Sequence, residues 1–228
     1  MADKIAVVLS GCGVFDGTEV HEASAACVSI SRAGKQPIFY SIDKTHHHEV
    51  NHLTGQNDDA TQRNVMVESS RIARGVVHEL SELTTDSVEA VIFPGGFGAA
   101  KNLSTFATSP EPTVDAEVAR VLRDFVAAGK PIGLCCIAPI LAALILAKED
   151  GIPIKITLGL KAGEGWPYAA TIDKAIEFGV QHEEKAVDEI CIDEERKIVT
   201  TPAFMFDAEF CQVYDGVAKM IEAVLGLI

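Results

Sequence analysis

The chain has 228 residues, enough for one α/β domain, and 48% of them are apolar, which supports a sizeable core and argues against a disordered or fibrous protein. Its 33 acidic and 19 basic residues give a net charge of −14, which opposes binding to a nucleic-acid backbone or to an anionic membrane surface. No stretch reaches the roughly 18 apolar residues that cross a bilayer. The six cysteines form no CxxC pair, so we expect reduced thiols and a cytoplasmic protein, or one of the mitochondrial matrix if a presequence has been removed.

Apolar runs and helical patterns alternate along the chain. In order, we expect strand 4–9, helix 19–33, strand 36–41, strand 88–93, helix 113–129, strand 131–135, helix 138–148, a hairpin of 189–192 with 197–200, and helix 207–225. This alternation predicts an α/β fold with a doubly wound, mostly parallel sheet that helices cover on both faces. No linker divides it, so we expect a single domain over residues 1–228. The polar segments 46–64 and 161–170 are interpreted as excursions from the sheet.

The turn after residue 135 contains the strongest candidate for chemistry, because ligands of such sheets bind at the carboxyl ends of the strands. Cys136 follows the strand directly, and Pro139 suits the first turn of the next helix. The positive end of that helix dipole favours a thiolate, and N–H groups of the turn, including that of Ile137, can stabilise an oxyanion. We therefore predict a nucleophile elbow with Cys136 as the nucleophile, and Cys135 as a core residue of the strand.

A second turn, after strand 88–93, contains Gly95 and Gly96. Consecutive glycines let the backbone approach a ligand and present N–H groups to an anion. A tight turn without a function has the same sequence, but the elbow one strand away favours oxyanion binding. We therefore expect Gly95 and Gly96 in the pocket with Ile137, and Asn102 as a further lining residue.

Acidic residues recur at the start of the first helix. Glu19 and Glu22 lie on adjoining positions of one helix face, at the ligand end of the sheet. Acids in a first turn commonly serve only the helix dipole, whereas a carboxyl group slightly deeper can be buried beside a thiol. We predict that Glu22 is a general acid/base with a raised pKa, and that Glu19 lies in the pocket.

The histidines are less informative. His46, His47 and His48 lie in a polar excursion, where we expect them to be exposed to solvent. His182 and Glu184 resemble the His-x-Glu pair of a Cys-His-Glu triad, but they precede the last two strands instead of following them. We expect no metal and no bound cofactor.

Four segments together, 10–23, 93–103, 133–139 and 199–204, closely resemble the enhancing-lycopene-biosynthesis protein family. That family is a glyoxalase-like branch of the PfpI/class I glutamine amidotransferase-like superfamily, and the resemblance spans nearly the whole chain. It implies a flavodoxin-like α/β sandwich, usually dimeric, with a cysteine on the elbow and a glutamate from the first helix. By position these are Cys136 and Glu22.

The chain departs from the superfamily patterns in two places. PfpI-type enzymes have His-Gly after the elbow cysteine, whereas this chain has Ile137 and Ala138, which argues against a protease triad. Glutamine amidotransferases have His-Pro-Glu after the last core strand, where this chain has Thr201, Pro202 and Ala203. That sequence argues against glutaminase activity.

The resemblance implies a cofactor-free glyoxalase of the glyoxalase III type. Its substrate would be glyoxal or a similar small dicarbonyl, converted to a hydroxy acid through a hemithioacetal of Cys136, with Glu22 as acid/base. Two alternatives stay open: a low-turnover stress-response or redox-sensing protein that uses Cys136, and a glutamine amidotransferase-like subunit that depends on Cys136 and His182. The expected partners are the small substrate and a second copy of the chain, without nucleic acid or membrane.

Overall fold

The computed structural model describes residues 3–58 and 60–228, and within them the chain forms a seven-stranded sheet with the order β10-β11-β7-β6-β1-β2-β5. The strands are β1 (Lys4–Leu9), β2 (Gln36–Ser41), β5 (His78–Glu79), β6 (Ala90–Phe93), β7 (Ile132–Cys135), β10 (Cys191–Asp193) and β11 (Ile198–Thr201). Only the β10–β11 pair of this sheet is antiparallel. The core order β2-β1-β6-β7-β11 is that of a flavodoxin-like fold, so the predicted fold class is confirmed.

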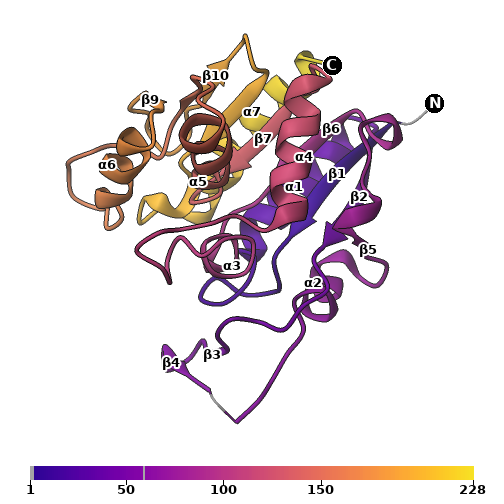
Figure 1. Cartoon of the computed structure of the whole chain (residues 1–228), viewed down its shortest axis with the longest axis vertical. Helices are drawn as coiled ribbons and strands as arrows, with labels where there is room; N and C mark the ends of the chain where they lie inside the picture. The colour runs from indigo at the N-terminus through magenta and orange to yellow at the C-terminus, as the bar shows by residue number, and fades with distance from the viewer. Residues whose placement is uncertain (1–2, 59) are drawn as a thin grey trace.

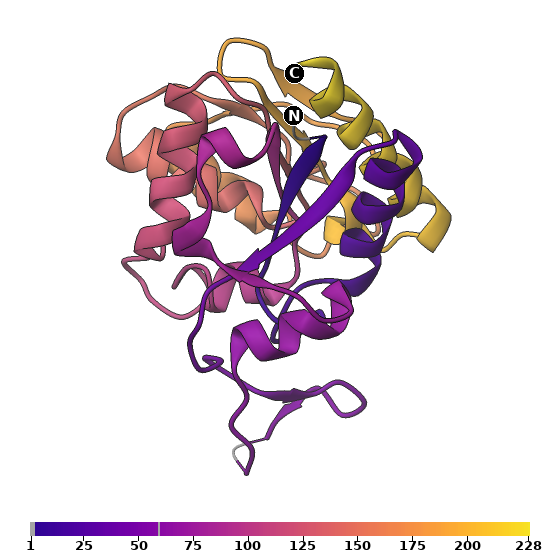
Figure 2. The same cartoon turned by 90° about the vertical axis from the view of Figure 1, so that its right-hand side faces the viewer.

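Helices cover both faces of the sheet. They are α1 (Val20–Arg32), α2 (Val65–Ala73), α3 (Phe97–Lys101), α4 (Ala116–Ala127), α5 (Pro139–Ala142), α6 (Ala170–Glu177) and α7 (Phe210–Gly226). Figures 1 and 2 show α1 and α7 side by side on one face, and α4 and α5 on the other. Short 3₁₀ turns connect some of these elements: η1 (Leu80–Glu82), η2 (Thr85–Ser87) and η4 (Ala203–Met205).

The predicted helix 138–148 changes its geometry after one turn. α5 continues directly into a π-helical segment, η3 (Ala143–Glu149). Every residue from 139 to 147 is buried, and this helix packs against α4 and α3. Among the described residues, none of the helices combines the length and the apolar character that a membrane-crossing helix needs.

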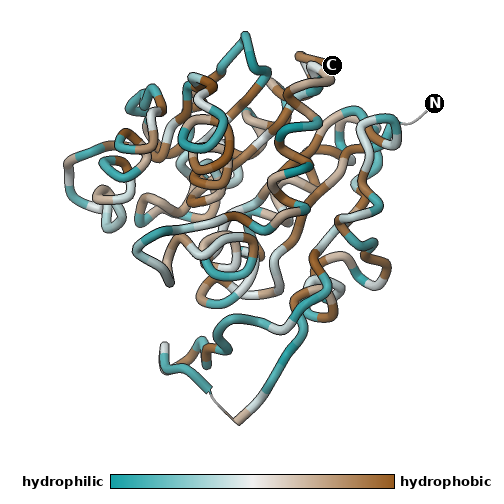
Figure 3. Tube along the Cα trace, in the orientation of Figure 1, coloured by the Kyte–Doolittle hydropathy of each residue, from teal (hydrophilic) through white to brown (hydrophobic). Residues whose placement is uncertain are grey.

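The core lies in the centre of the sheet. Residues 5–9 of β1 are at most 1% exposed, as expected of a central parallel strand that is covered on both faces. Figure 3 shows this pattern as apolar segments in the strands and hydrophilic segments at the periphery. The chain order of the strands reverses between β1 and β6, so the carboxyl ends of these two strands form the expected ligand-binding edge.

Two excursions leave the sheet near this edge. The first carries the small hairpin β3 (Val50–Asn51) and β4 (Gln56–Asn57), which projects from one end of the molecule (Figures 1 and 2). The second lies between β8 (Lys155–Ile156) and β9 (Gln181–His182), which pair with each other. The prediction of solvent exposure was wrong for His46, which is only 6% exposed because its ring packs against the backbone of Gly11.

Candidate active site

Cys136 occupies a strained turn directly after β7. Its φ of 59° lies in the left-handed region, which a residue with a side chain rarely adopts. The turn is held by a hydrogen bond from the Cys136 N–H to the carbonyl oxygen of Thr201 (3.0 Å) and by one from the Ala138 N–H to that of Cys135 (3.0 Å). Pro139 then begins α5. This geometry is that of the predicted elbow.

Glu22 lies in the first turn of α1 and is completely buried. Its Oε2 accepts hydrogen bonds from the Gly95 N–H (2.8 Å) and from the Cys135 thiol (3.5 Å), and its Oε1 accepts one from the Phe204 N–H (3.4 Å). The Cys136 thiol lies beside this carboxyl group and interacts with it electrostatically. The structure therefore brings together the two residues that the sequence singled out. Cys135 is a core residue, as expected, but it also contacts Glu22.

Burial sets the protonation of this pair. Burial, followed by the negative charge of Glu19, raises the pKa of Glu22 from 4.5 to about 7. Burial, followed by the negative charge of Glu22, raises the pKa of Cys136 well above its usual value. The N–H groups of Gly96 and Ile137 oppose this effect without overcoming it. The predicted thiolate was therefore wrong: the resting thiol is protonated at neutral pH and needs a base.

The two glycines of the second turn have different roles. The Gly95 N–H is bound to Glu22, so the expectation that it binds a substrate oxyanion was wrong. A Cβ on Gly95 would lie 2.5 Å from the Cβ of Cys136 and 2.9 Å from Oε2 of Glu22, and the close packing there requires glycine. Gly96 and Ile137 line the pocket in front of Cys136, and their N–H groups face its sulfur.

Glu19 does not line this pocket, contrary to expectation, because it caps α1. Its Oε2 accepts a hydrogen bond from the N–H of Glu22 (2.7 Å), and its Oε1 lies 2.8 Å from Nδ1 of His21. The negative charge of Glu19 therefore lies close to Glu22 and raises its pKa.

Asn102 also lies outside the pocket. Its Nδ2 donates to the carbonyl oxygens of Ser10 (3.0 Å) and Asp16 (2.8 Å), and its Oδ1 accepts from the His47 N–H (3.0 Å). These bonds connect the turn after β1 to the first excursion. Asn102 therefore connects two loops through hydrogen bonds and does not line the pocket of Cys136. It borders a separate, polar cavity.

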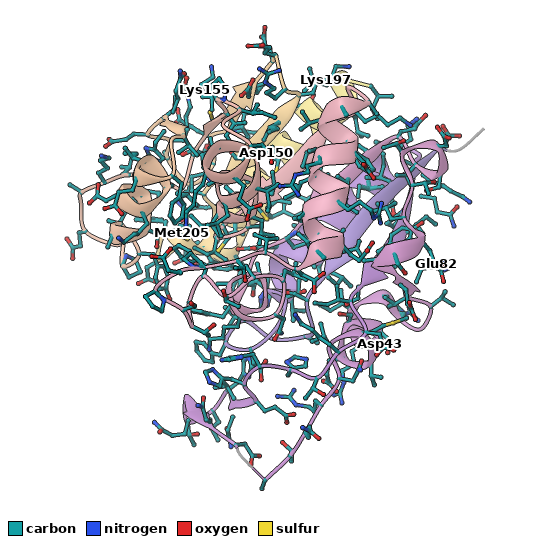
Figure 4. The ribbon with its side chains drawn as sticks, in the orientation of Figure 1. Asp43, Glu82, Asp150, Lys155, Lys197 and Met205 are labelled. Carbon is teal, nitrogen blue, oxygen red and sulfur yellow. The ribbon has the colours of Figure 1, made fainter. Side chains whose placement is uncertain are left out.

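The pocket in front of Cys136 has a volume of about 110 Å³ and mostly apolar walls. Its lining residues are Val14, Gly96, Phe97, Ala100, Phe106, Ala107, Cys136, Ile137, Tyr168, Thr171, Phe204 and Met205, the last of which Figure 4 labels. The hydroxyl groups come from Tyr168 and Thr171, which the sequence reasoning did not select. The Trp-Pro-Tyr sequence at 166–168 could have indicated Tyr168 as a pocket residue, since aromatic residues are unusual in an otherwise polar excursion.

His182 does not reach the pocket. Its Nε2 accepts a hydrogen bond from the Leu158 N–H (3.1 Å), and burial lowers its pKa. No histidine belongs to the described residues that line the pocket. Within residues 3–58 and 60–228, no cluster of three or more His, Cys, Asp or Glu side chains is arranged to hold a metal ion.

No family model matches the chain. It is 47% identical to the glutamine amidotransferase-like class 1 domain-containing protein 3, mitochondrial, of Homo sapiens, over 99% of this chain and 84% of that protein. It is 46% identical to the ES1 protein homolog, mitochondrial, of Rattus norvegicus, over 98% of this chain and 84% of that protein.

Solved structures have the same fold. An isoprenoid biosynthesis protein with an amidotransferase-like domain from Ehrlichia chaffeensis has a TM-score of 0.87 and 27% identity, with 99% of this chain and 100% of that chain covered. A ThiJ/PfpI domain protein from Brachyspira murdochii has a TM-score of 0.59 and 14% identity, with 99% and 98% covered. The chain therefore belongs to the family of the ES1 proteins and glutamine amidotransferase-like class 1 domain-containing protein 3, within the PfpI/class I glutamine amidotransferase-like superfamily.

Proposed function

We propose that the protein is a cofactor-free glyoxalase that converts a small dicarbonyl to a 2-hydroxy acid. The observation that carries this proposal is the buried carboxyl group of Glu22 beside the Cys136 thiol, with a pKa of about 7. A group with this pKa both accepts and returns a proton at neutral pH, which glyoxalase chemistry requires. The pair lies behind an apolar pocket that suits a small neutral molecule.

The proposed reaction begins with Glu22 as a carboxylate. It takes the thiol proton of Cys136 while the sulfur adds to the aldehyde carbon, and the proton then passes to the new alkoxide to give a hemithioacetal. Glu22 next removes the hydrogen of that carbon as a proton, and the electron pair forms an enediolate whose charge lies on the former ketone oxygen. Glu22 returns the same proton to the neighbouring carbon, and the hydroxyl proton of the hemithioacetal passes to the charged oxygen, which leaves a thioester of a 2-hydroxy acid. Water hydrolyses the thioester and restores the thiol.

This sequence of steps is balanced within the substrate. One carbonyl carbon is oxidised and its neighbour is reduced, so the substrate neither gains nor loses electrons overall. The N–H groups of Gly96 and Ile137 are placed to stabilise the oxyanion at the carbon bound to sulfur. Because Glu22 removes the thiol proton during the attack, Cys136 can act as the nucleophile although its pKa is raised.

The glutaminase alternative is less well supported. Glutamine would bring an ammonium and a carboxylate group into a pocket whose described lining contains no charged side chain. Leaving these charges unpaired in apolar surroundings would be costly. The hydrogen bond from Leu158 also holds His182 away from Cys136.

A redox-sensing role is the second candidate, and the surroundings of the Cys136 sulfur favour it. A hydroperoxide would oxidise the thiol to a sulfenic acid and leave as an alcohol or water, and Glu22 with the N–H groups of Gly96 and Ile137 could hydrogen-bond the product. Mass spectrometry after mild peroxide treatment distinguishes the candidates. Selective oxidation of Cys136 together with negligible dicarbonyl turnover would favour the sensor.

The test of the glyoxalase proposal measures glycolate from glyoxal and lactate from methylglyoxal. We expect turnover by the wild type. We expect kcat to fall by at least about 10³-fold in Cys136→Ser and in Glu22→Gln, because the nucleophile and the acid/base act together and the reaction needs both. Cys211→Ser is the matched control, since Cys211 is an exposed free cysteine. No turnover by the wild type, or full activity in Cys136→Ser, would refute the proposal.

Two finer assignments accompany this function. We propose that the chain is related to the enhancing-lycopene-biosynthesis proteins within the superfamily, and the similarity to an isoprenoid biosynthesis protein supports this relationship. We also propose a reducing compartment. All six cysteines, each in the described part of the chain, are free, and the names of the two mitochondrial relatives favour the mitochondrial matrix over the cytoplasm.

A further inference from the structure

Tyr168 lines the same pocket as Cys136. It is 40% exposed. The edge of its ring contacts Phe97, with the ring centroids 6.1 Å apart and the planes at 77°. Burial, followed by the negative charge of an ionised Cys136, raises the pKa of the Tyr168 hydroxyl. The hydroxyl group therefore lies within electrostatic reach of the reacting sulfur and stays protonated at neutral pH.

The segment that carries Tyr168 is anchored by Trp166. The indole ring lies directly on Gly159, where a Cβ would be 1.9 Å from its Cζ3, and its centroid is 4.9 Å from that of Phe206. The Asp207 N–H donates to the carbonyl oxygen of Gly165 (2.8 Å). These contacts fix the excursion 161–170 against the chain that follows β11. Tyr168 is thus held in place by the fold and does not depend on a ligand for its position.

The pocket walls restrict what can bind between Tyr168 and Cys136. Phe97, Phe106 and Phe204 supply aromatic surface, and the remaining walls are mostly aliphatic. No Lys, Arg, His, Asp or Glu belongs to the described lining. A charged substituent would lose its hydration there without gaining a partner, whereas an apolar substituent would gain by leaving water.

We propose that this pocket selects a neutral 2-oxoaldehyde with an apolar substituent on its ketone carbon, and that Tyr168 is the catalytic residue that hydrogen-bonds the ketone oxygen. This inference rests on the proposed glyoxalase function and names its substrate class. The aldehyde carbon reacts with Cys136 while the substituent lies on the aromatic wall. Tyr168 donates a hydrogen bond and keeps its proton, so the proton transfers by Glu22 are unchanged. The bond strengthens as negative charge develops on the ketone oxygen in the enediol step.

The experiment measures kcat and KM for glyoxal, methylglyoxal and phenylglyoxal. For the wild type, we expect kcat/KM for the two substituted oxoaldehydes to exceed that for glyoxal by about 10-fold or more, mainly through KM. In Tyr168→Phe, which keeps the ring contact with Phe97, we expect kcat for methylglyoxal to fall about 10-fold with a smaller change in KM.

Tyr214→Phe is the control, because it removes a phenol from α7 that does not line the pocket. We expect its kinetics to equal those of the wild type. Equal kcat/KM for glyoxal and the substituted oxoaldehydes, or an unchanged kcat in Tyr168→Phe, would overturn this inference and leave the glyoxalase function intact. No turnover of any of the aldehydes by the wild type would instead refute the proposed function and this inference with it.

Discussion

Glu22 reaches Cys136 across the carboxyl edge of the sheet. Glu22 comes from α1 on one face, whereas Cys136 precedes α5 on the other. The interaction of these two side chains thus joins the two helical layers at the point where the strand order reverses. The same carboxyl group accepts the Gly95 N–H, so the turn after β6 also depends on it. A single buried acid therefore connects the chemistry of the site to the stability of the fold.

The first prediction concerns stability and pH. Because the pKa of Glu22 is raised from 4.5 to about 7 in the folded protein, the folded state binds this proton more tightly than the unfolded state does. The free energy of unfolding should therefore fall as pH rises from 4.5 to 7, and the penalty is complete above pH 7. The difference 7 − 4.5 = 2.5 corresponds to about 3 kcal/mol. Urea unfolding of wild type and Glu22→Gln at several pH values measures it. An equal pH dependence in both proteins would contradict it.

The second prediction concerns Glu19. Its negative charge is the second cause, after burial, of the raised pKa of Glu22. Glu19→Gln keeps an oxygen for the helix cap but removes this charge, so the pKa of Glu22 should decrease. Since the proposed reaction begins with the Glu22 carboxylate, the rising limb of kcat/KM should move to lower pH. A pH–rate profile of the variant checks the direction. A limb that stays in place, or moves to higher pH, would show that Glu19 has no such influence.

The third prediction uses two glycines in different surroundings. A Cβ on Gly95 would lie 2.5 Å from the Cβ of Cys136, so Gly95→Ala should destabilise the protein by about 1–3 kcal/mol and abolish turnover. Gly226 lies at the exposed end of α7 with nothing within 4 Å of its added Cβ. Gly226→Ala should be neutral or stabilise by up to about 1 kcal/mol and keep full activity. Thermal unfolding and turnover are measured for both variants. A Gly95→Ala variant that remains active would contradict this prediction.

The elements that the sequence predicted are those with strong local signals. The strands that contain residues 5–9 and 132–135 are continuous apolar runs, as central parallel strands must be. Cys136 and Glu22 could be chosen because the topology brings strand ends and the first helical turn to one edge. The two-residue strands β5, β8 and β9 are too short for a pattern to specify.

The remaining errors concern properties that depend on tertiary contacts. Whether Glu19 faces the pocket or caps its helix depends on which hydrogen bond its carboxylate makes, and sequence spacing does not determine that. The same holds for Asn102, whose amide spans two loops. The pKa of Cys136 depends on the balance of burial against N–H groups, which only coordinates provide. Tyr168 lies in an irregular segment, where periodicity carries no information about direction.

A charge network that the sequence did not indicate holds the first excursion to the sheet. Arg63 donates to Asp16 (2.6 Å), to Glu49 (3.1 Å) and to Glu68 (3.4 Å), and these three acids are almost completely buried. Burial alone would raise the pKa of Glu49, but hydrogen bonds from Thr61 and Arg63 lower it overall. This contribution to stability is present above pH 4.5 and is lost as pH falls through the lowered pKa of Glu49.

The fourth prediction follows from this network. Arg63→Ala leaves three buried carboxylates without their common partner, and we expect the free energy of unfolding to fall by about 2–4 kcal/mol, somewhat less than for a fully buried pair because the Arg63 side chain is 29% exposed. Arg71→Ala is the matched control: it removes another cation from Glu68, but its side chain is 67% exposed, so the loss should stay below about 1 kcal/mol. Urea unfolding and limited proteolysis of segment 46–64 compare the variants. Equal stability of the two would mean that Arg63 does not hold the excursion in place.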